Sequence, residues 1–444
     1  MTWEVLPLAE VAEVRLGRQR SPKNHQGKKM RPYLRAANVG WSGLLLNDVK
    51  SMNFTDAEMI TYRLHPGDIV LSEASGSPGE VGKPALWTGE LDDCAFQNTL
   101  IRVRPTAHEP RFLLHYFRYV ALTGGFLPSS RGVGINHLGR ARLAGWPTPL
   151  PSTAEQRRIV EILEDHLSRL DAAADYASAA DRRLARLRDQ VVMDAITGRH
   201  EAGARTAVFP EPAGTADGDL PELPYDWRWR RLGEIAEVVG GVTKDAKKQN
   251  DPAFVEVPYL RVANVQRGML RLDDVTSIRV APTKVDALRL MPGDVLMNEG
   301  GDRDKLARGW VWEGQIDGCI HQNHVFRARA HEGIDPYFLS WCANTIGGRW
   351  AERNGKQSVN LASISLSMIR KMPVIVPPFE VAQRIVADLH DRLRELDQAT
   401  ASITALQTRT AGLRRSVLTA AFKGQLTGGR TDDEAIEEFA GAMA

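Results

Sequence analysis

The sequence predicts a mixed α/β (α+β) protein made of two globular modules, joined by two long antiparallel coiled-coil helices with internal pseudo-two-fold symmetry. The first observation is a repeat: LRAANVG starts at residue 34 and LRVANVQ at residue 260, a shift of 226. Each repeat opens with short apolar runs between Gly and Pro residues, which is typical of strands bounded by turns. Each repeat closes with apolar residues at three- and four-residue steps, which is typical of a coiled-coil helix.

The repeat extends over most of the chain. Order and spacing persist between the copies, and the period is far longer than that of solenoid repeats, so it indicates tandem duplication of a module followed by a helix. Three more pairs of blocks illustrate it: LAEVAEV (8–14) and LGEIAEV (232–238), LHPGDIVLSE (64–73) and LMPGDVLMNE (290–299), and CAFQN (94–98) and CIHQN (319–323).

Helix signals set the expected boundaries. Ser152 and Glu155 form a capping-box pattern at the start of the first helix, and Gly198 and Gly424 stand where C-terminal caps are expected. Each helix carries a single apolar stripe, so the other copy is its expected partner. The segment between the copies is dense in Pro, Gly and Ala, which predicts a flexible or extended linker. We therefore expect a first module at 1–150, a first helix at 151–198, a linker at 199–226, a second module at 227–378, a second helix at 379–424 and a tail at 425–444.

Composition narrows the class of protein without fixing it. The chain has 444 residues, of which 43% are apolar and 25% charged, and no apolar run is long enough to span a bilayer, so we expect a cytoplasmic protein without a membrane partner. Three scattered cysteines fit a reducing compartment and do not form a CxxC-type metal site. A net charge of +2 does not decide for or against nucleic acid, because a polyanion needs only a local basic face.

Such a local basic segment follows the first predicted strand. Residues 15–47 carry eight Lys or Arg and no Asp or Glu. Unopposed cations with Asn and Gln suit contacts to phosphates and base edges, although a solvated basic loop explains an isolated run equally simply. The matching loop of the second repeat is again basic, but Asp245 and Asp251 dilute its charge. The candidate DNA contacts in these two loops are Arg18, Arg20, Lys23, Asn24, Lys28, Lys29, Lys244, Lys247, Lys248, Gln249 and Asn250.

A second candidate loop lies near the end of each module, at 129–137 and 353–360. Its Gly and Ser residues allow backbone amides to approach phosphates, although ordinary turn chemistry accounts for them as well. The candidate contacts here are Arg131, Lys356 and Gln357.

Several motifs resemble catalytic sites but lack a necessary part. GSPGEVGKP (76–84) has the wrong glycine spacing for a phosphate-binding loop, and VPPFE (376–380) has Val where an amino-methyltransferase needs Asn or Asp. The histidines of HQNH (321–324) and the aspartates Asp68 and Asp294 are better explained as structural residues. We therefore expect no catalytic residue, metal or cofactor in this chain.

Together these features resemble the specificity subunit of type I restriction-modification systems. The blocks that carry the resemblance are LPYDWRWRRLGEIAEV (223–238), YLRVANV (259–265), PGDVLMNEGG (292–301), EQRRIV (155–160) and AAFKGQL (420–426). The resemblance implies that each module is a target-recognition domain for one half-site of double-stranded DNA, and that the helices fix the spacer and dock two methyltransferase (modification) subunits. Those partners would carry S-adenosylmethionine, and a restriction (motor-nuclease) subunit that uses ATP and Mg²⁺ can join them.

The two modules are related but different, which predicts a bipartite, asymmetric DNA site read by a non-catalytic subunit. Two alternatives remain open at this point. One is a scaffold or regulator of such a system whose modules no longer read DNA. The other is a self-contained methyltransferase or nuclease, against which the missing cofactor loop and metal cluster count.

Overall fold

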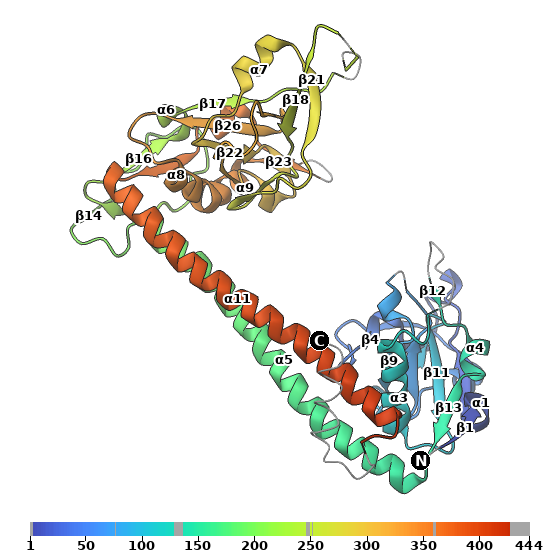
Figure 1. Ribbon diagram of the computed structural model, residues 1–444. Helices are drawn as coiled ribbons and strands as arrows, with labels where there is room; N and C mark the ends of the chain where they lie inside the picture. The colour runs from blue at the N-terminus through green and yellow to red at the C-terminus, as the bar shows by residue number, and fades with distance from the viewer. Residues whose placement is uncertain are drawn as a thin grey trace. The chain divides into compact units, whose positions relative to one another are not determined.

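The computed structural model describes residues 3–75, 77–127, 136–245, 249–250, 252–357 and 361–426. Strands and helices are mixed as expected, and the chain forms two compact units, Met1–Ala179 with Ser402–Ala444 and Ala180–Ala401 (Figure 1). Each unit contains one module and about half of each long helix, α5 (Thr153–Ile196) and α11 (Phe379–Phe422). The predicted fold class is confirmed. Among the described residues, no helix combines the length and apolar character needed to cross a membrane.

The first module is built around a four-stranded antiparallel sheet with a three-stranded sheet beside it. Phe112, Leu113 and Phe117 of helix α3 are fully buried, and Leu113 and Phe117 cover the apolar face of the larger sheet. In strand order, the sheets are β2 (Ala12–Leu16), β11 (Leu100–Pro105), β7 (Ile69–Ser72), β9 (Pro84–Leu86), and β10 (Ala95–Phe96), β3 (Met30–Leu34), β6 (Lys50–Asn53). The remaining pairs are β1 (Glu4–Pro7) with β13 (Pro147–Leu150), β4 (Val39–Gly40) with β5 (Gly43–Leu44), and β8 (Ala74–Ser75) with β12 (Asn136–His137). The helices are α1 (Leu8–Val11), α2 (Asp56–Tyr62), α3 (Pro110–Leu122) and α4 (Arg140–Ala144), with 3-10 turns at Pro22–Asn24, Ala36–Asn38 and Pro78–Glu80.

The second module repeats both sheets in the same order and sense, including one parallel pair in the smaller sheet. The sheets are β17 (Ala236–Gly240), β26 (Val325–Ala330), β22 (Asp294–Asn298), β24 (Gly309–Val311), and β21 (Thr276–Val280), β18 (Val255–Leu260), β25 (Ile320–His321). Smaller sheets join β16 (Arg228–Arg231) to β29 (Pro373–Val376), β19 (Val265–Gln266) to β20 (Met269–Leu270), β14 (Arg205–Thr206) to β15 (Leu223–Pro224), and β23 (Gly300–Gly301) to β28 (Ala362–Ser363) and β27 (Lys356–Gln357). The helices are α6 (Leu232–Ile235), α7 (Pro282–Leu288), α8 (Pro336–Cys342), α9 (Gly348–Asn354) and α10 (Leu366–Ile369), with a π-helical turn at Ala343–Gly347 and a 3-10 turn at Arg303–Lys305.

The repeated PGD turns are structural, as the sequence suggested. The Asp68 carboxylate is 1% exposed, accepts a hydrogen bond from the His65 backbone N–H at 2.7 Å and pairs with Arg104 at 2.6 Å. Asp294 repeats this arrangement with the Met291 N–H at 2.7 Å and Arg329 at 2.8 Å. Each carboxylate therefore closes its turn and neutralises an arginine of the neighbouring strand.

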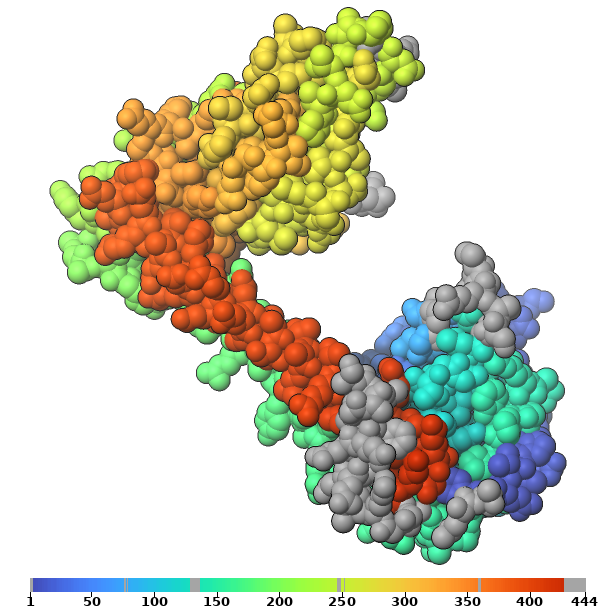
Figure 2. Space-filling view, viewed as in Figure 1, coloured from blue at the N-terminus to red at the C-terminus, as the bar shows by residue number. Residues whose placement is uncertain are grey.

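The long helices pack antiparallel within each unit. In the first unit, Leu163 and Leu167 near the start of α5 pack with Val417 and Ala421 near the end of α11, which lies against the module in Figure 2. In the second unit, Val192 and Ile196 at the end of α5 share a cluster with Ile385 and Leu389 at the start of α11. Two ion pairs join the helices, Asp171 with Arg414 in the first unit and Asp397 with Arg188 in the second. These pairs are related by the 226-residue shift with the helices exchanged, so the repeat extends to the contacts between the helices.

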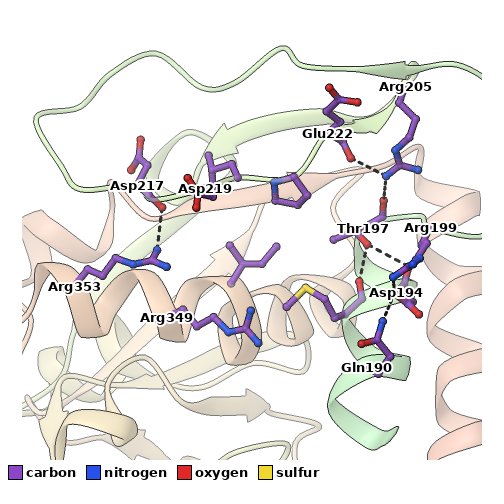
Figure 3. A pocket seen from close by; sticks show the side chains of 14 residues that line it. Gln190, Asp194, Thr197, Arg199, Arg205, Asp217, Asp219, Glu222, Arg349 and Arg353 are labelled. Carbon is purple, nitrogen blue, oxygen red and sulfur yellow. Dashed lines mark hydrogen bonds and ion pairs between the residues drawn. The ribbon is translucent and has the colours of Figure 1, made fainter. Parts of the chain in front are cut away.

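Hydrogen bonds tie the segment between the copies to the second module. Asp217 accepts hydrogen bonds from Arg231 at 2.8 and 2.9 Å and from the Trp350 indole at 3.0 Å. The hydrogen bonds from Arg231 hold the pKa of Asp217 below its ordinary value. Figure 3 shows residues of this segment lining a pocket of about 710 Å³, where Arg205 donates hydrogen bonds to the Glu222 and Thr197 carbonyls. A composition rich in Pro and Gly does not report such contacts.

Candidate nucleic-acid interface

The first candidate loop of each module begins where the chain passes close beside the Gln–Asn pair and the strand that precedes it. This close approach occurs at the equivalent position in both modules. In the first module the Arg18 N–H donates to the Phe96 carbonyl at 3.1 Å, and the Asn98 N–H donates to the Arg18 carbonyl at 3.0 Å. Val242 makes the same two contacts with His321 and Asn323, both at 2.9 Å. Gly17 and Gly241, which directly precede Arg18 and Val242, permit this close approach. An added Cβ would lie 2.2 Å from the Gln97 carbonyl oxygen at Gly17 and 2.0 Å from the His321 carbonyl oxygen at Gly241.

The second candidate loop of each module lies near the same Gln–Asn pair, because a glutamate joins the two segments through backbone hydrogen bonds. The Glu73 N–H donates to the Thr99 carbonyl at 2.9 Å, and the Glu73 carbonyl accepts from the Leu138 N–H at 2.7 Å. In the second module, Glu299 makes the equivalent bonds to His324 and Ile364, both at 2.9 Å. We call Glu73, Gln97, Asn98 and His137 the junction of the first module, and Glu299, Gln322, Asn323 and His324 the junction of the second. The structure thus brings both candidate loops of a module to one junction.

The prediction of unopposed cations in the first loop is wrong for part of the loop. Arg18 pairs with Glu58 at 2.7 Å, Lys29 pairs with Asp56, and Arg31 pairs with Asp56 at 2.8 Å. The hydrogen bond from Lys29 lowers the pKa of Asp56. These acids belong to helix α2, so a segment without acids in the sequence acquires them when the chain folds.

Three other cations of this loop stay open to solvent. Arg20, Lys23 and Lys28 are exposed and have no carboxylate partner among the residues that the structure describes. Arg20 donates from Nε to the His25 ring at 3.0 Å, which leaves its charge uncompensated. The half-buried Asn24 lies in the adjoining 3-10 turn, Pro22–Asn24. These are the loop residues best placed to contact phosphate.

The candidates of the second module fall into different environments. Gln249 braces strand β21, since its amide accepts from the Arg279 N–H at 3.1 Å and donates to the Asp245 carbonyl at 3.0 Å. Lys244 and Asn250 are exposed, and Lys356 and Gln357 form the exposed strand β27. Three of the predicted contacts, Arg131, Lys247 and Lys248, lie outside the described residues.

The junctions contain polar side chains that the sequence reasoning missed. Gln97, Asn98 and Gln322 are half-buried, and within the described ranges their side-chain amides form no hydrogen bond. A side-chain amide can donate to and accept from one adenine edge at once. The signal was present in the sequence, because the Gln–Asn pair recurs in CAFQN and CIHQN. In both copies the pair directly follows residues that are buried.

Each junction also holds a glutamate paired with a histidine. The glutamates occupy equivalent positions in the repeat, but the histidines do not. Glu73 pairs with His137 Nδ1 at 3.1 Å, and Glu299 pairs with His324 Nδ1 at 2.5 Å. His324 is thus an exposed junction residue, whereas His321 is the buried structural histidine that we expected. Burial lowers the pKa of His321 to about 4, and its Nδ1 lies 2.7 Å from the Val325 carbonyl oxygen.

Exposed cations at this edge can contact a negatively charged surface, and the side-chain amides and carboxylates beside them can form hydrogen bonds to polar groups. No group of three or more His, Cys, Asp or Glu side chains within the described ranges is arranged to hold a metal ion. Burial raises the pKa of each cysteine, Cys94, Cys319 and Cys342, to about 12. A duplicated module with one recognition edge per copy defines a two-module recognition protein.

Comparisons with known proteins show which recognition proteins this chain resembles. Residues 1–174 match the family model of the type I restriction modification DNA specificity domain. The chain is 24% identical to the type I restriction enzyme StySPI specificity subunit of Salmonella potsdam over 96% of this chain and 89% of that protein. It is 23% identical to the EcoKI specificity subunit of Escherichia coli K12, with the same coverage. The chain is therefore similar to type I restriction enzyme specificity subunits over nearly its whole length, and the match to the family model lies in its first 174 residues.

A solved structure supports the fold. It comes from a study of complex assembly and conformational transition of the type I R-M system, and one of its chains matches with a TM-score of 0.67. The two chains are 20% identical, and the match covers 96% of this chain and 98% of the other.

Proposed function

We propose that this chain is the DNA-specificity subunit of a type I restriction-modification complex and reads a bipartite, asymmetric site with its two modules. The observation that carries the proposal is the duplicated junction with different side chains around it. Both junctions present a Gln–Asn pair and a glutamate, but the histidine comes from position 137 in one copy and from position 324 in the other. A shared frame with different polar groups suits two related surfaces that read different base sequences.

In this proposal the exposed cations position each module on the DNA backbone and the junction reads base edges. Arg20, Lys23 and Lys28 supply the backbone contacts of the first module, with Lys244 and Lys356 in equivalent roles in the second. The paired cations Arg18 and Lys29 hold the loop against helix α2. Contacts to phosphate give affinity without sequence preference, and contacts to bases give the preference.

The chain itself performs no chemistry in this account. Two methyltransferase subunits would bind S-adenosylmethionine and methylate adenine, and a restriction subunit using ATP and Mg²⁺ would join where the system includes one. The long helices would dock these partners and set the spacer between the half-sites. We propose the cytoplasm as the place of action, because the DNA target and the cofactors are there.

Methylome sequencing tests this function directly. The chain is expressed with the modification subunit of its own system in a host without restriction-modification genes, and methylated adenines are mapped by single-molecule sequencing. We expect one motif with two specific parts and an unspecific gap, which disappears when the chain is omitted. A regulator that no longer reads DNA would give no motif, and methylation that persists without the chain would refute the proposal.

A further inference from the structure

The first unit contains a small cavity whose walls are apolar but whose charged groups are both cations. It has a volume of about 220 Å³ and lies where helix α3 meets α5 and α11. Trp41, Leu122 and Leu418 form apolar walls, while the guanidinium groups of Arg118 and Arg414 line the same space. None of the candidate DNA contacts and none of the junction residues lines this cavity, although Trp41 and Ser42 belong to the basic segment 15–47.

Arg118 is half-buried and has no polar partner within the described ranges. Its Nε is buried without an acceptor, and Arg118 has no hydrogen bond or ion pair among the described residues. Burial, and after it the positive charge of Arg414, lowers the pKa of Arg118. The carboxylates nearby are already engaged, because Asp171 pairs with Arg414 and Glu164 pairs with Arg111 at 3.0 Å. Leaving the buried Nε–H donor without an acceptor is unfavourable, and the terminal N–H donors of the guanidinium remain available to an incoming group.

The second unit satisfies the equivalent positions internally. The 226-residue shift places Asn344 at the position of Arg118 and Arg267 at that of Trp41. Arg267 donates to the Asn344 carbonyl and to the Asp304 carbonyl, and the Asn344 side chain accepts from the Gly309 N–H at 3.0 Å. The helix ion pair is retained, with Arg188 and Asp397 in place of Arg414 and Asp171. The unmet cation is therefore a feature of the first unit and not a requirement of the fold.

We propose that this cavity receives an aspartate or glutamate side chain of the modification subunit, an inference that rests on the proposed function. A carboxylate matches the paired N–H donors of a guanidinium, and apolar walls strengthen such a contact by excluding water. The volume of about 220 Å³ lies below the roughly 300–1,000 Å³ of small-molecule pockets, which fits one side chain better than a nucleotide. A DNA backbone would need an open row of cations instead of two that share an enclosed space.

The principal test replaces Arg118 by methionine, which keeps an unbranched apolar side chain at this position and removes the guanidinium charge. The affinity of the full-length chain for the modification subunit is measured by biolayer interferometry, and the thermal stability of the free chain is measured beside it. We expect Arg118→Met to weaken the partner about tenfold or more, as for a lost charged hydrogen bond, while the free chain melts at the same or a higher temperature. A purely structural arginine would instead lower the melting temperature.

Two further variants separate the cavity from the helix pair. Arg414→Met and Arg188→Met each remove one ion pair between α5 and α11, but only Arg414 lines the cavity. We expect Arg414→Met to weaken the partner more than Arg188→Met. Ser42→Trp, at the exposed rim, should also weaken it by filling the entrance without changing any charge.

The outcomes are distinguishable. Equal partner affinity for the wild-type chain and Arg118→Met, with equal effects of the two helix variants, would overturn the inference. Loss of DNA affinity in the assembled complex with unchanged partner affinity would assign the cavity to a phosphate and also overturn it. Failure of the wild-type chain to bind the modification subunit would count against the proposed function itself.

Discussion

The exposed cations of the first loop provide the sharpest quantitative prediction about DNA binding. Replacing Arg20, Lys23 and Lys28 together by glutamine removes three positive charges that have no carboxylate partner among the described residues. The backbone of the loop stays anchored, because Arg18 keeps its hydrogen bonds to Phe96 and Asn98 and its ion pair with Glu58. The perturbation therefore changes charge at the surface and leaves the junction in place.

The magnitude follows from counterion release. Each phosphate contact contributes about 0.9 to the slope of log affinity against log salt concentration, so the triple variant loses about 2.7 of slope. When the salt concentration rises fourfold, from 50 to 200 mM, the DNA affinity of the triple variant should therefore fall about 40-fold less than that of the wild-type complex. A cation that folding has already paired contributes less, so Lys29→Gln should change the slope by clearly less than 0.9.

The assay is fluorescence anisotropy with a duplex that carries the methylated motif, measured for the complex of chain and modification subunit at several salt concentrations. A second duplex without the motif should show the same loss of slope, since phosphate contacts do not depend on sequence. An unchanged slope in the triple variant would refute the assignment of this loop to the DNA backbone. A loss confined to the cognate duplex would instead make these residues base readers.

Two further predictions concern the second module. The folded-state pKa of His321 is about 4, which lies below its unfolded value of about 6.5. The contribution of this histidine to the free energy of unfolding is therefore fully present above pH 6.5, and about 3 kcal/mol of it is lost as the pH falls towards 4. His321→Phe, which installs the residue found at the equivalent Phe96, should flatten this loss in urea unfolding from pH 7.5 to 4.5, and an identical pH profile would contradict it. Asp294→Asn should lower the opening free energy of strands β22 and β26 by about 2–3 kcal/mol in hydrogen–deuterium exchange, less than for a fully buried pair because Arg329 is 39% exposed. Unchanged protection of these strands would show that the pair is dispensable.

The sequence was sufficient for features that depend on local pattern or on repetition. The spacing of apolar residues predicted both long helices, and the PGD turns predicted aspartates that act structurally, because a turn is set by residues adjacent in the chain. The repeat was more informative than the apolar spacing or the PGD turns, because a comparison of the two copies distinguishes the residues that they share from the residues that differ. The reciprocal pairs Asp171–Arg414 and Asp397–Arg188 follow the same shift and could have been found in the sequence.

The rest depended on contacts between distant residues. Arg18 and Lys29 looked unopposed because Glu58 and Asp56 lie on a later helix. The contacts of Asp217 in the linker with Arg231 and Trp350 could not be predicted either, because these residues lie far from Asp217 in the sequence. Gln249 looked like a base reader, but its amide is used by the backbone of β21. Composition reports which groups are available, whereas the fold decides which of them remain free to bind.

The most direct test of the central claim is to exchange one module and map methylation. Residues 1–150 are replaced by the corresponding module of a similar type I specificity subunit, and the chimera is expressed with the modification subunit in a host without restriction-modification genes. The account predicts that one half of the methylated motif changes, while the other half and the gap remain those of the original chain. A change in both halves would contradict the claim that each module reads its own half-site.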